Sequence, residues 1–126
     1  MLPTLISDDP EVMRQAIVAT CDAIAQAVPG IPGLHLEGPY LASSRKGTHD
    51  AGKFRVPDDA EFELVASLGN GVTVMTLAPE CVSGDTTGDT IRGLAARGVL
   101  LCAGHTAGSY EQIRAGLDAG IRGCTH

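Results

Sequence analysis

Aromatic residues are scarce in this chain, at 3%, and tryptophan is absent. Leu, Val, Ile and Ala must therefore fill the core, which an apolar content of 44% allows. No apolar run approaches the roughly 20 residues of a membrane span, and the first residues lack the basic segment of a signal peptide. These absences predict a globular chain with no membrane partner, and 126 residues suit one domain.

Positive charge is also in short supply, with 9 basic against 15 acidic residues and a net charge of −6. Nucleic acids and anionic membranes bind through basic patches, so this balance excludes both as partners. A small anionic substrate needs only a few local cations and stays compatible with it. The four cysteines show no CxxC spacing. We therefore expect reduced thiols and a cytoplasmic protein rather than a disulfide framework.

Apolar segments with the character of strands alternate along the chain with segments of helical periodicity. We expect strands at 2–6, 33–37, 72–77, 99–103 and 121–126. We expect helices at 10–28, 58–69, 89–97 and 109–120, the first of them capped by a carboxylate of Asp8 or Asp9 before Pro10, and loops at 38–57 and 81–88. Strict alternation of strands and helices predicts parallel strands with helices packed on the sheet.

Two architectures fit this order: a doubly wound sheet and part of a (β/α)8 barrel. A Gly-x-Gly-x-x-Gly motif after the first strand is absent, which disfavours a dinucleotide-binding sheet. Candidate functional residues instead end several different strands, which is typical of a barrel. A full barrel needs about 250 residues. The sequence therefore predicts an α/β fold, namely a partial (β/α)8 TIM-like barrel with about four βα units and a final strand.

Three strand ends carry metal-binding side chains. Glu37 ends the strand at 33–37, where alternation places it on the same side as His35. His105 follows the strand at 99–103, and His126 ends the last one. One carboxylate and two imidazoles with an open position for water suit Zn²⁺ or a similar metal. A single strand-end histidine is more often only hydrogen-bonded, and that interpretation is preferred for His35.

Several motifs together carry a resemblance to a known family. They are HLEGPYL at 35–41, KGTH at 46–49, LAPE at 77–80, AGHT at 103–106 and CTH at 124–126. In this order they resemble N-acetylglucosamine-6-phosphate deacetylase, of the amidohydrolase superfamily. His49 of KGTH follows Glu37 of HLEGP by 12 residues, and His105 and His126 lie 21 residues apart. Both spacings are specific to this resemblance.

The resemblance implies a divalent metal, Zn²⁺ first and iron as the alternative, held by Glu37, His105 and His126. It implies that Thr48 and His49 contact a sugar phosphate substrate, and that N-acetylglucosamine 6-phosphate is deacetylated to glucosamine 6-phosphate and acetate in amino-sugar catabolism. The full-length form is expected to be a homo-oligomer. The family's general base is an aspartate on a later strand, expected beyond the C-terminus of residues 1–126. Residues 1–126 are then a partial barrel domain, truncated at both ends, with no catalytic residue of their own.

Several alternatives remain beside this interpretation. The chain alone is expected to be inactive, so a catalytically silent fragment that only binds metal or associates with other chains is the second hypothesis. Glu80 either lines the site at the carboxyl ends of the strands or has a structural role, and the structural role is favoured. A nucleophilic Cys102 is disfavoured because burial in a strand raises a thiol pKa. The basic residues of the long loop either steer a phosphate or are merely solvated: Arg45, Lys46, Lys53 and Arg55.

Overall fold

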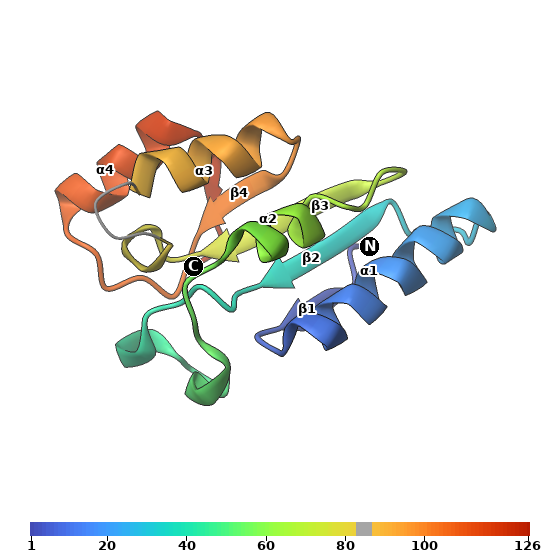
Figure 1. Cartoon of the computed structure of the whole chain (residues 1–126), viewed down its shortest axis with the longest axis horizontal. Coiled ribbons are helices and arrows are strands. Elements are labelled where there is room, and N and C mark those ends of the chain that lie inside the picture. Colours follow the sequence, from blue (N-terminus) through green and yellow to red (C-terminus); the bar gives the residue numbers. More distant parts are fainter. Residues whose placement is uncertain (83–86) are drawn as a thin grey trace.

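The computed structural model describes residues 1–82 and 87–126, and over these residues it has one parallel sheet with helices packed against it (Figure 1). The strands are β1 (Thr4–Ile6), β2 (Gly33–Glu37), β3 (Val72–Leu77), β4 (Leu100–Ala103) and β5 (Gly123–Cys124). The helices are α1 (Pro10–Ala25), α2 (Asp59–Val65), α3 (Thr87–Ala96) and α4 (Tyr110–Ala119). None of these helices is long and apolar enough to cross a membrane.

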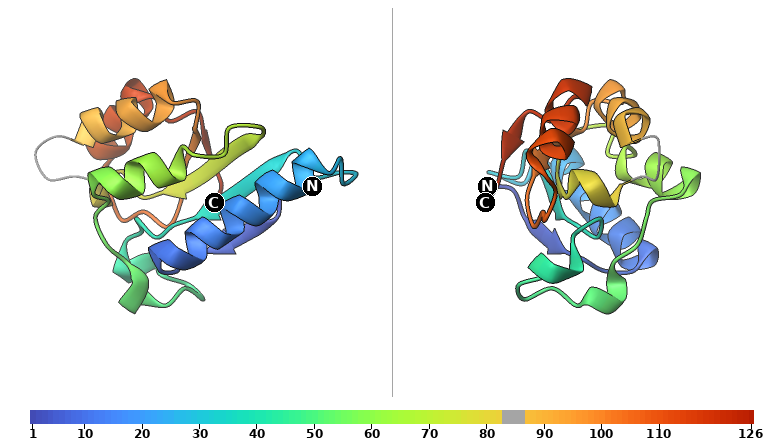
Figure 2. Two further views of the ribbon diagram at one scale, coloured as in Figure 1. Left: turned by 45° about the vertical axis from the view of Figure 1, so that its right-hand side comes forward. Right: turned by 90° about the vertical axis from the view of Figure 1, so that its left-hand side faces the viewer.

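The strand order decides between the two architectures. The 5 strands lie in the order β1-β2-β3-β4-β5, and each is parallel to its neighbour. A doubly wound sheet reverses its order at a switch point and carries helices on both faces. Here the order is sequential and the helices lie along one face of the strands (Figure 2). The predicted partial (β/α)8 barrel is confirmed, with four βα units and a final strand.

The core lies between the sheet and its helices. Leu36 is in register with Met75, and Met75 with Leu101, so these side chains share one face of the sheet. All three are at most 1% exposed, and Met13 of α1 and Ile91 of α3 pack into the same cluster. The helices therefore cover this face, as the alternation of apolar residues in the strands requires.

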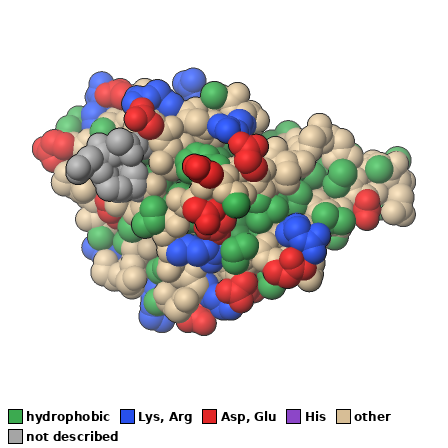
Figure 3. All heavy atoms as spheres, viewed as in Figure 1, with side chains coloured by type: hydrophobic (Ala, Val, Ile, Leu, Met, Phe, Trp, Pro, Cys, Tyr) green, Lys and Arg blue, Asp and Glu red, His purple; other side chains and the backbone are tan. Residues whose placement is uncertain are grey.

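The opposite face of the sheet is bare in places. Ile6, Val72 and Leu100 belong to this face by alternation, and they are 47%, 41% and 48% exposed. In a closed barrel this face is the interior, which side chains fill. The helical side looks different in Figure 3, where acidic and basic side chains are interspersed and no extended basic patch is visible.

Several predicted boundaries were wrong. Helix α1 ends at Ala25 rather than 28, because Ala27 takes a left-handed φ of 54° that turns the chain. The predicted carboxylate cap of α1 was also wrong. Asp9 occupies the N-cap position, but its side chain makes no capping hydrogen bond, and the side chain of Asp8 accepts from the N–H of Asp9. Helix α2 ends at Val65 rather than 69, where Ser67 donates to the carbonyl of Leu64.

The loops are partly structured. The expected loop 38–57 contains two 3-10 turns, Ser43–Arg45 and Ala51–Lys53. Of the expected loop 81–88, residues 83–86 lie outside the described part, and 87–88 belong to α3. The last strand is confined to Gly123–Cys124, shorter than 121–126. Helix α4 has the predicted capping box between Ser109 and Gln112.

Candidate metal centre

Glu37 marks the carboxyl end of β2, at the edge where the other strands also end. Its strand places Leu34 and Leu36 toward the helices and His35 and Glu37 toward the opposite face. Gly38 then turns the chain with a left-handed φ of 84°, and its N–H donates to the carbonyl of Thr76 at 2.9 Å. The Glu37 side chain is 19% exposed, so most of it is shielded from solvent.

His105 faces Glu37 from the end of β4, two strands away. Its Nε2 lies 3.0 Å from Oε1 of Glu37. Its Nδ1 lies 2.6 Å from the main-chain carbonyl oxygen of Arg45. A carbonyl oxygen only accepts, so Nδ1 carries a proton and donates it. The backbone of His105 is left-handed, with φ 49°, a strained conformation that aims the ring at the carboxylate.

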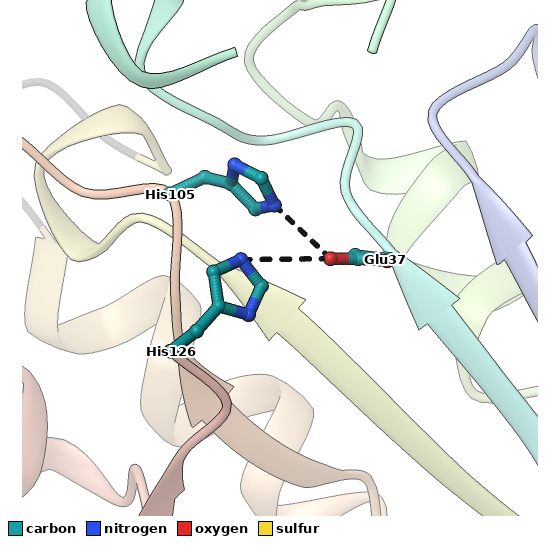
Figure 4. A group of neighbouring side chains, drawn as sticks. All are labelled: Glu37, His105 and His126. Atoms are coloured by element: carbon teal, nitrogen blue, oxygen red, sulfur yellow. Dashed lines mark hydrogen bonds and ion pairs between the residues drawn. The ribbon is translucent and has the colours of Figure 1, made fainter. Parts of the chain in front are cut away.

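His126 completes the cluster from the end of β5. Its Nε2 lies 3.7 Å from Oε1 of Glu37, and its ring stands edge-on to that of His105, with ring centroids 4.3 Å apart. The preceding Thr125 is tied to β4 through its N–H, which donates to Ala103 at 2.9 Å. Figure 4 shows both imidazoles directed at one oxygen of Glu37. The predicted ligand trio is therefore brought together.

The geometry of the trio fits a metal ion. One ligand atom from each of the three residues lies within 4.8 Å of the other two. Tetrahedral zinc with bonds of about 2.0–2.1 Å sets ligand atoms roughly 3.3 Å apart, between the observed 3.0 and 3.7 Å. The hydrogen bond from Nδ1 of His105 to Arg45 is the outer contact that orients a metal-binding imidazole.

The protonation of His105 gives an independent reason to expect a cation. With its proton on Nδ1, a neutral imidazole presents a lone pair at Nε2, only 3.0 Å from a carboxylate oxygen. Two lone pairs at that distance repel each other. Either a second proton sits on Nε2, or a metal ion lies between the two atoms. A metal therefore replaces one proton when it binds.

Glu37 is held in its charged form by the surrounding imidazoles. Burial by itself raises the pKa of this carboxyl group. The hydrogen bond from His105 and the attraction of His49, His105 and His126 outweigh burial, so the pKa is lowered from its usual value. A carboxylate that stays ionised is the form that binds a metal.

His49 joins the cluster from the long loop and is only 3% exposed. Its Nε2 lies 3.8 Å from Oε1 of Glu37. Its Nδ1 accepts from the N–H of Ser7 at 3.3 Å and lies 2.9 Å from the Ser7 hydroxyl. Burial and the nearby charge of His105 lower the pKa of His49. The sequence predicted His49 at the site but gave no role to Ser7.

The remaining polar candidates of the long loop differ in whether their side chains are already paired. Thr48 is exposed beside His49. Arg45 lines a cavity of about 350 Å³ together with His105, Thr106 and His126. Lys53 pairs with Asp8 and Asp9, and Arg55 pairs with Glu61. Of the two interpretations of the basic loop, phosphate steering therefore stays open for Arg45 and is disfavoured for Lys53 and Arg55.

Glu80 has the structural role that the sequence favoured. Its carboxylate accepts from the hydroxyl of Thr106 and from the N–H of Ala107, both at 2.7 Å. These bonds brace the turn that follows His105. Cys102 lies in β4, where burial above all raises the pKa of its thiol. The thiolate that a nucleophile needs is therefore disfavoured.

Ser7 and the carbonyl of Arg45 are the contacts that the sequence did not reveal. Ser7 directly follows β1, so like Glu37 and His105 it lies at the carboxyl end of a strand. Serine is common after strands, and only the β1–β2 register, with Ile6 opposite Glu37, places it beside the cluster. A main-chain carbonyl leaves no trace in a sequence.

The fold and the cluster define a class. A sequentially ordered parallel sheet with candidate ligands at its carboxyl edge is part of a β/α barrel that carries its site on that edge. No protein-family model matches the chain. N-acetylgalactosamine-6-phosphate deacetylase of Shewanella sp. (strain ANA-3) is 40% identical over 126 residues, which cover 100% of this chain and 31% of that protein. Human N-acetylglucosamine-6-phosphate deacetylase is 34% identical, with coverage of 98% and 30%.

A solved structure agrees with these relatives. N-acetyl-D-glucosamine-6-phosphate deacetylase from Mycobacterium smegmatis superposes with a TM-score of 0.84 at 32% identity, covering 98% of this chain and 32% of that one. The chain is thus homologous to the N-acetylglucosamine- and N-acetylgalactosamine-6-phosphate deacetylases. It spans about a third of their length.

Proposed function

We propose that this chain carries the metal-binding part of a deacetylase for an N-acetylated amino-sugar 6-phosphate. The products are the free amino sugar phosphate and acetate. The observation that carries this proposal is the convergence of Glu37, His105 and His126, with the Nδ1 proton of His105 committed to Arg45. The homology to deacetylases of the glucosamine and galactosamine compounds supports the substrate class.

The residues of the chain have distinct parts in this reaction. Glu37, His105 and His126 hold a divalent metal, with Zn²⁺ favoured and iron as the alternative. A metal held by these residues would polarise the amide carbonyl and would lower the pKa of a bound water. His49 donates a hydrogen bond to the substrate, Thr48 contacts the sugar, and Arg45 attracts the phosphate at the rim of the cavity. Proton transfer to the leaving amine needs an acid–base group, and we assign it to none of these residues.

The test is acetate release from the two sugar phosphates by the purified chain, with Zn²⁺ or Fe²⁺ supplied. Turnover of about 1–10³ s⁻¹, abolished in Glu37→Gln and retained in Glu63→Gln, supports an active deacetylase. Glu63 is a matched control because it is exposed and pairs with Arg97 on the surface. Turnover that is equal in both variants contradicts the proposal.

A second candidate function follows from the bare face of the sheet. Ile6, Val72 and Leu100 are exposed there, and β1 and β5 are the edges of the described sheet. Unpaired edges and exposed apolar side chains favour association. The chain then binds metal without turnover and associates with further polypeptide. Metal binding with no acetate release, combined with association in solution, distinguishes this function from the first.

A further inference from the structure

The unexplained feature of the site is the contact between Ser7 and His49, which differs in kind from the contact that holds His105. Ser7 is 5% exposed and lies at the end of β1. Its N–H and its hydroxyl both approach Nδ1 of His49, at 3.3 and 2.9 Å. A main-chain N–H can only donate, so Nδ1 of His49 is an acceptor and carries no proton. The remaining proton of the ring is therefore on Nε2, which faces Glu37.

The two histidines thus use Nδ1 in opposite ways. His105 donates from Nδ1 to the carbonyl of Arg45, which leaves Nε2, the atom that faces Glu37, to give its lone pair to a metal. His49 accepts at Nδ1 and turns an Nε2–H toward the same oxygen. A metal ligand needs a lone pair directed at the ion, whereas an oxyanion or carbonyl needs a donor. The partner of each Nδ1 decides which task the ring can perform.

We propose that Ser7 is a positioning residue that fixes His49 as a hydrogen-bond donor and keeps it out of the ligand set of the metal. The inference rests on the proposed metal site. It means that Ser7, which is not a ligand itself, decides that His49 stays a donor while the neighbouring His105 and His126 bind the metal. Glycine at position 38 supports this arrangement, because a Cβ there would collide with the Ser7 hydroxyl. The hydroxyl also reaches the carbonyl oxygen of Glu37 at 3.4 Å, which ties its position to the metal-binding strand.

The test is a long-range ¹H–¹⁵N spectrum of the histidine rings in the full chain, first without metal and then with Zn²⁺. Loss of one set of signals in His49→Gln assigns the ring. We expect His49 to carry its proton on Nε2 in both spectra, whereas His105 keeps a proton on Nδ1 and has none on Nε2 once Zn²⁺ is bound. A proton on Nδ1 of His49, or loss of its Nε2 proton with Zn²⁺, overturns the proposal.

Variants of Ser7 separate its hydroxyl from its backbone. Ser7→Ala keeps the N–H and removes one hydrogen bond, which changes the tautomer ratio of His49 roughly 2- to 10-fold toward Nδ1–H. Ser7→Thr restores the hydroxyl and the ratio. The matched control Ser44→Ala, at an exposed serine of the loop that carries His49, leaves the ratio unchanged. An unchanged ratio in Ser7→Ala overturns the role of the hydroxyl. The metal-free spectra need neither zinc binding nor turnover, so they test the role of Ser7 even if the proposed function fails.

Discussion

At the scale of single residues, the site depends on which atoms carry protons. His35 illustrates this beneath the cluster, where Nδ1 lies 3.1 Å from the Thr4 hydroxyl and Nε2 lies 2.8 Å from the Thr76 hydroxyl. Burial is the main cause that lowers the pKa of His35, and repulsion by His126 adds to it. The histidine was expected to be buried and hydrogen-bonded rather than a ligand. It is half-buried, and both of its ring nitrogens have hydroxyl partners.

The lowered pKa of His35 predicts how stability varies with pH. Between the lowered folded pKa and the unfolded value near 6.5, the unfolded state binds more protons. The free energy of unfolding of the metal-free chain is therefore highest above pH 6.5 and decreases as the pH falls below it. His49 contributes in the same direction.

Urea unfolding at pH 7.5 and 5.5 measures this difference. His35→Gln removes one of the two histidines with a lowered pKa, so the difference in stability between the two pH values becomes smaller in that variant. A wild-type chain that is equally stable at both pH values, or more stable at pH 5.5, contradicts the prediction.

At the scale of elements, a chain of hydroxyl groups links the strands below the candidate metal centre. Thr76 of β3 lies beside His35 of β2 and donates to Thr125, which follows β5. Thr125 in turn donates to the carbonyl of Ala103 in β4 at 3.4 Å. These contacts join the strands that carry Glu37, His105 and His126, so they hold the ligands in register.

Replacing Thr76 by valine breaks this chain without a large change in shape. Thr76 is 0% exposed, so the ring nitrogen of His35 and the hydroxyl of Thr125 lose a partner inside the protein. We expect the free energy of unfolding to fall by about 1–3 kcal/mol. Thr73→Val is the matched control: Thr73 lies on the same strand, is 5% exposed and faces the helices. Equal losses in the two variants contradict the prediction.

The order and type of the elements were predictable because alternation and helical periodicity are local. Helix ends were less predictable: α1 ends where Ala27 turns left-handed, and no residue type demands that. In the site, Glu37, His105 and His126 could be found because each ends a strand and has the chemistry of a ligand. Ser7 could not, because its importance depends on the registry of β1 with β2 and on the folding of the loop that carries His49.

At the scale of the whole molecule, the helices cover only one face of the sheet, as the views in Figure 2 show. The other face combines the polar site at its carboxyl edge with exposed apolar side chains toward the opposite edge, among them Val72 and Leu100. Barrel closure buries this face in complete barrels. The same surface in this chain is expected to associate, either with further barrel elements or with other copies.

Sedimentation velocity over a range of concentrations tests this expectation. We expect the chain to associate as its concentration rises, and the pair Val72→Lys and Leu100→Lys to shift it toward monomer. Val56→Lys is the control, since Val56 is 62% exposed in the long loop. A wild-type chain that stays monomeric at every concentration contradicts the prediction.

A calorimetric titration of the metal-free chain with Zn²⁺ tests the metal site directly. We expect one ion per chain, bound with release of protons, and an affinity at least about 100-fold lower when Glu37, His105 or His126 is replaced by alanine. His35→Gln, a neighbour outside the ligand set, keeps most of the affinity. Stoichiometric binding that survives replacement of all three residues would contradict their assignment as metal ligands.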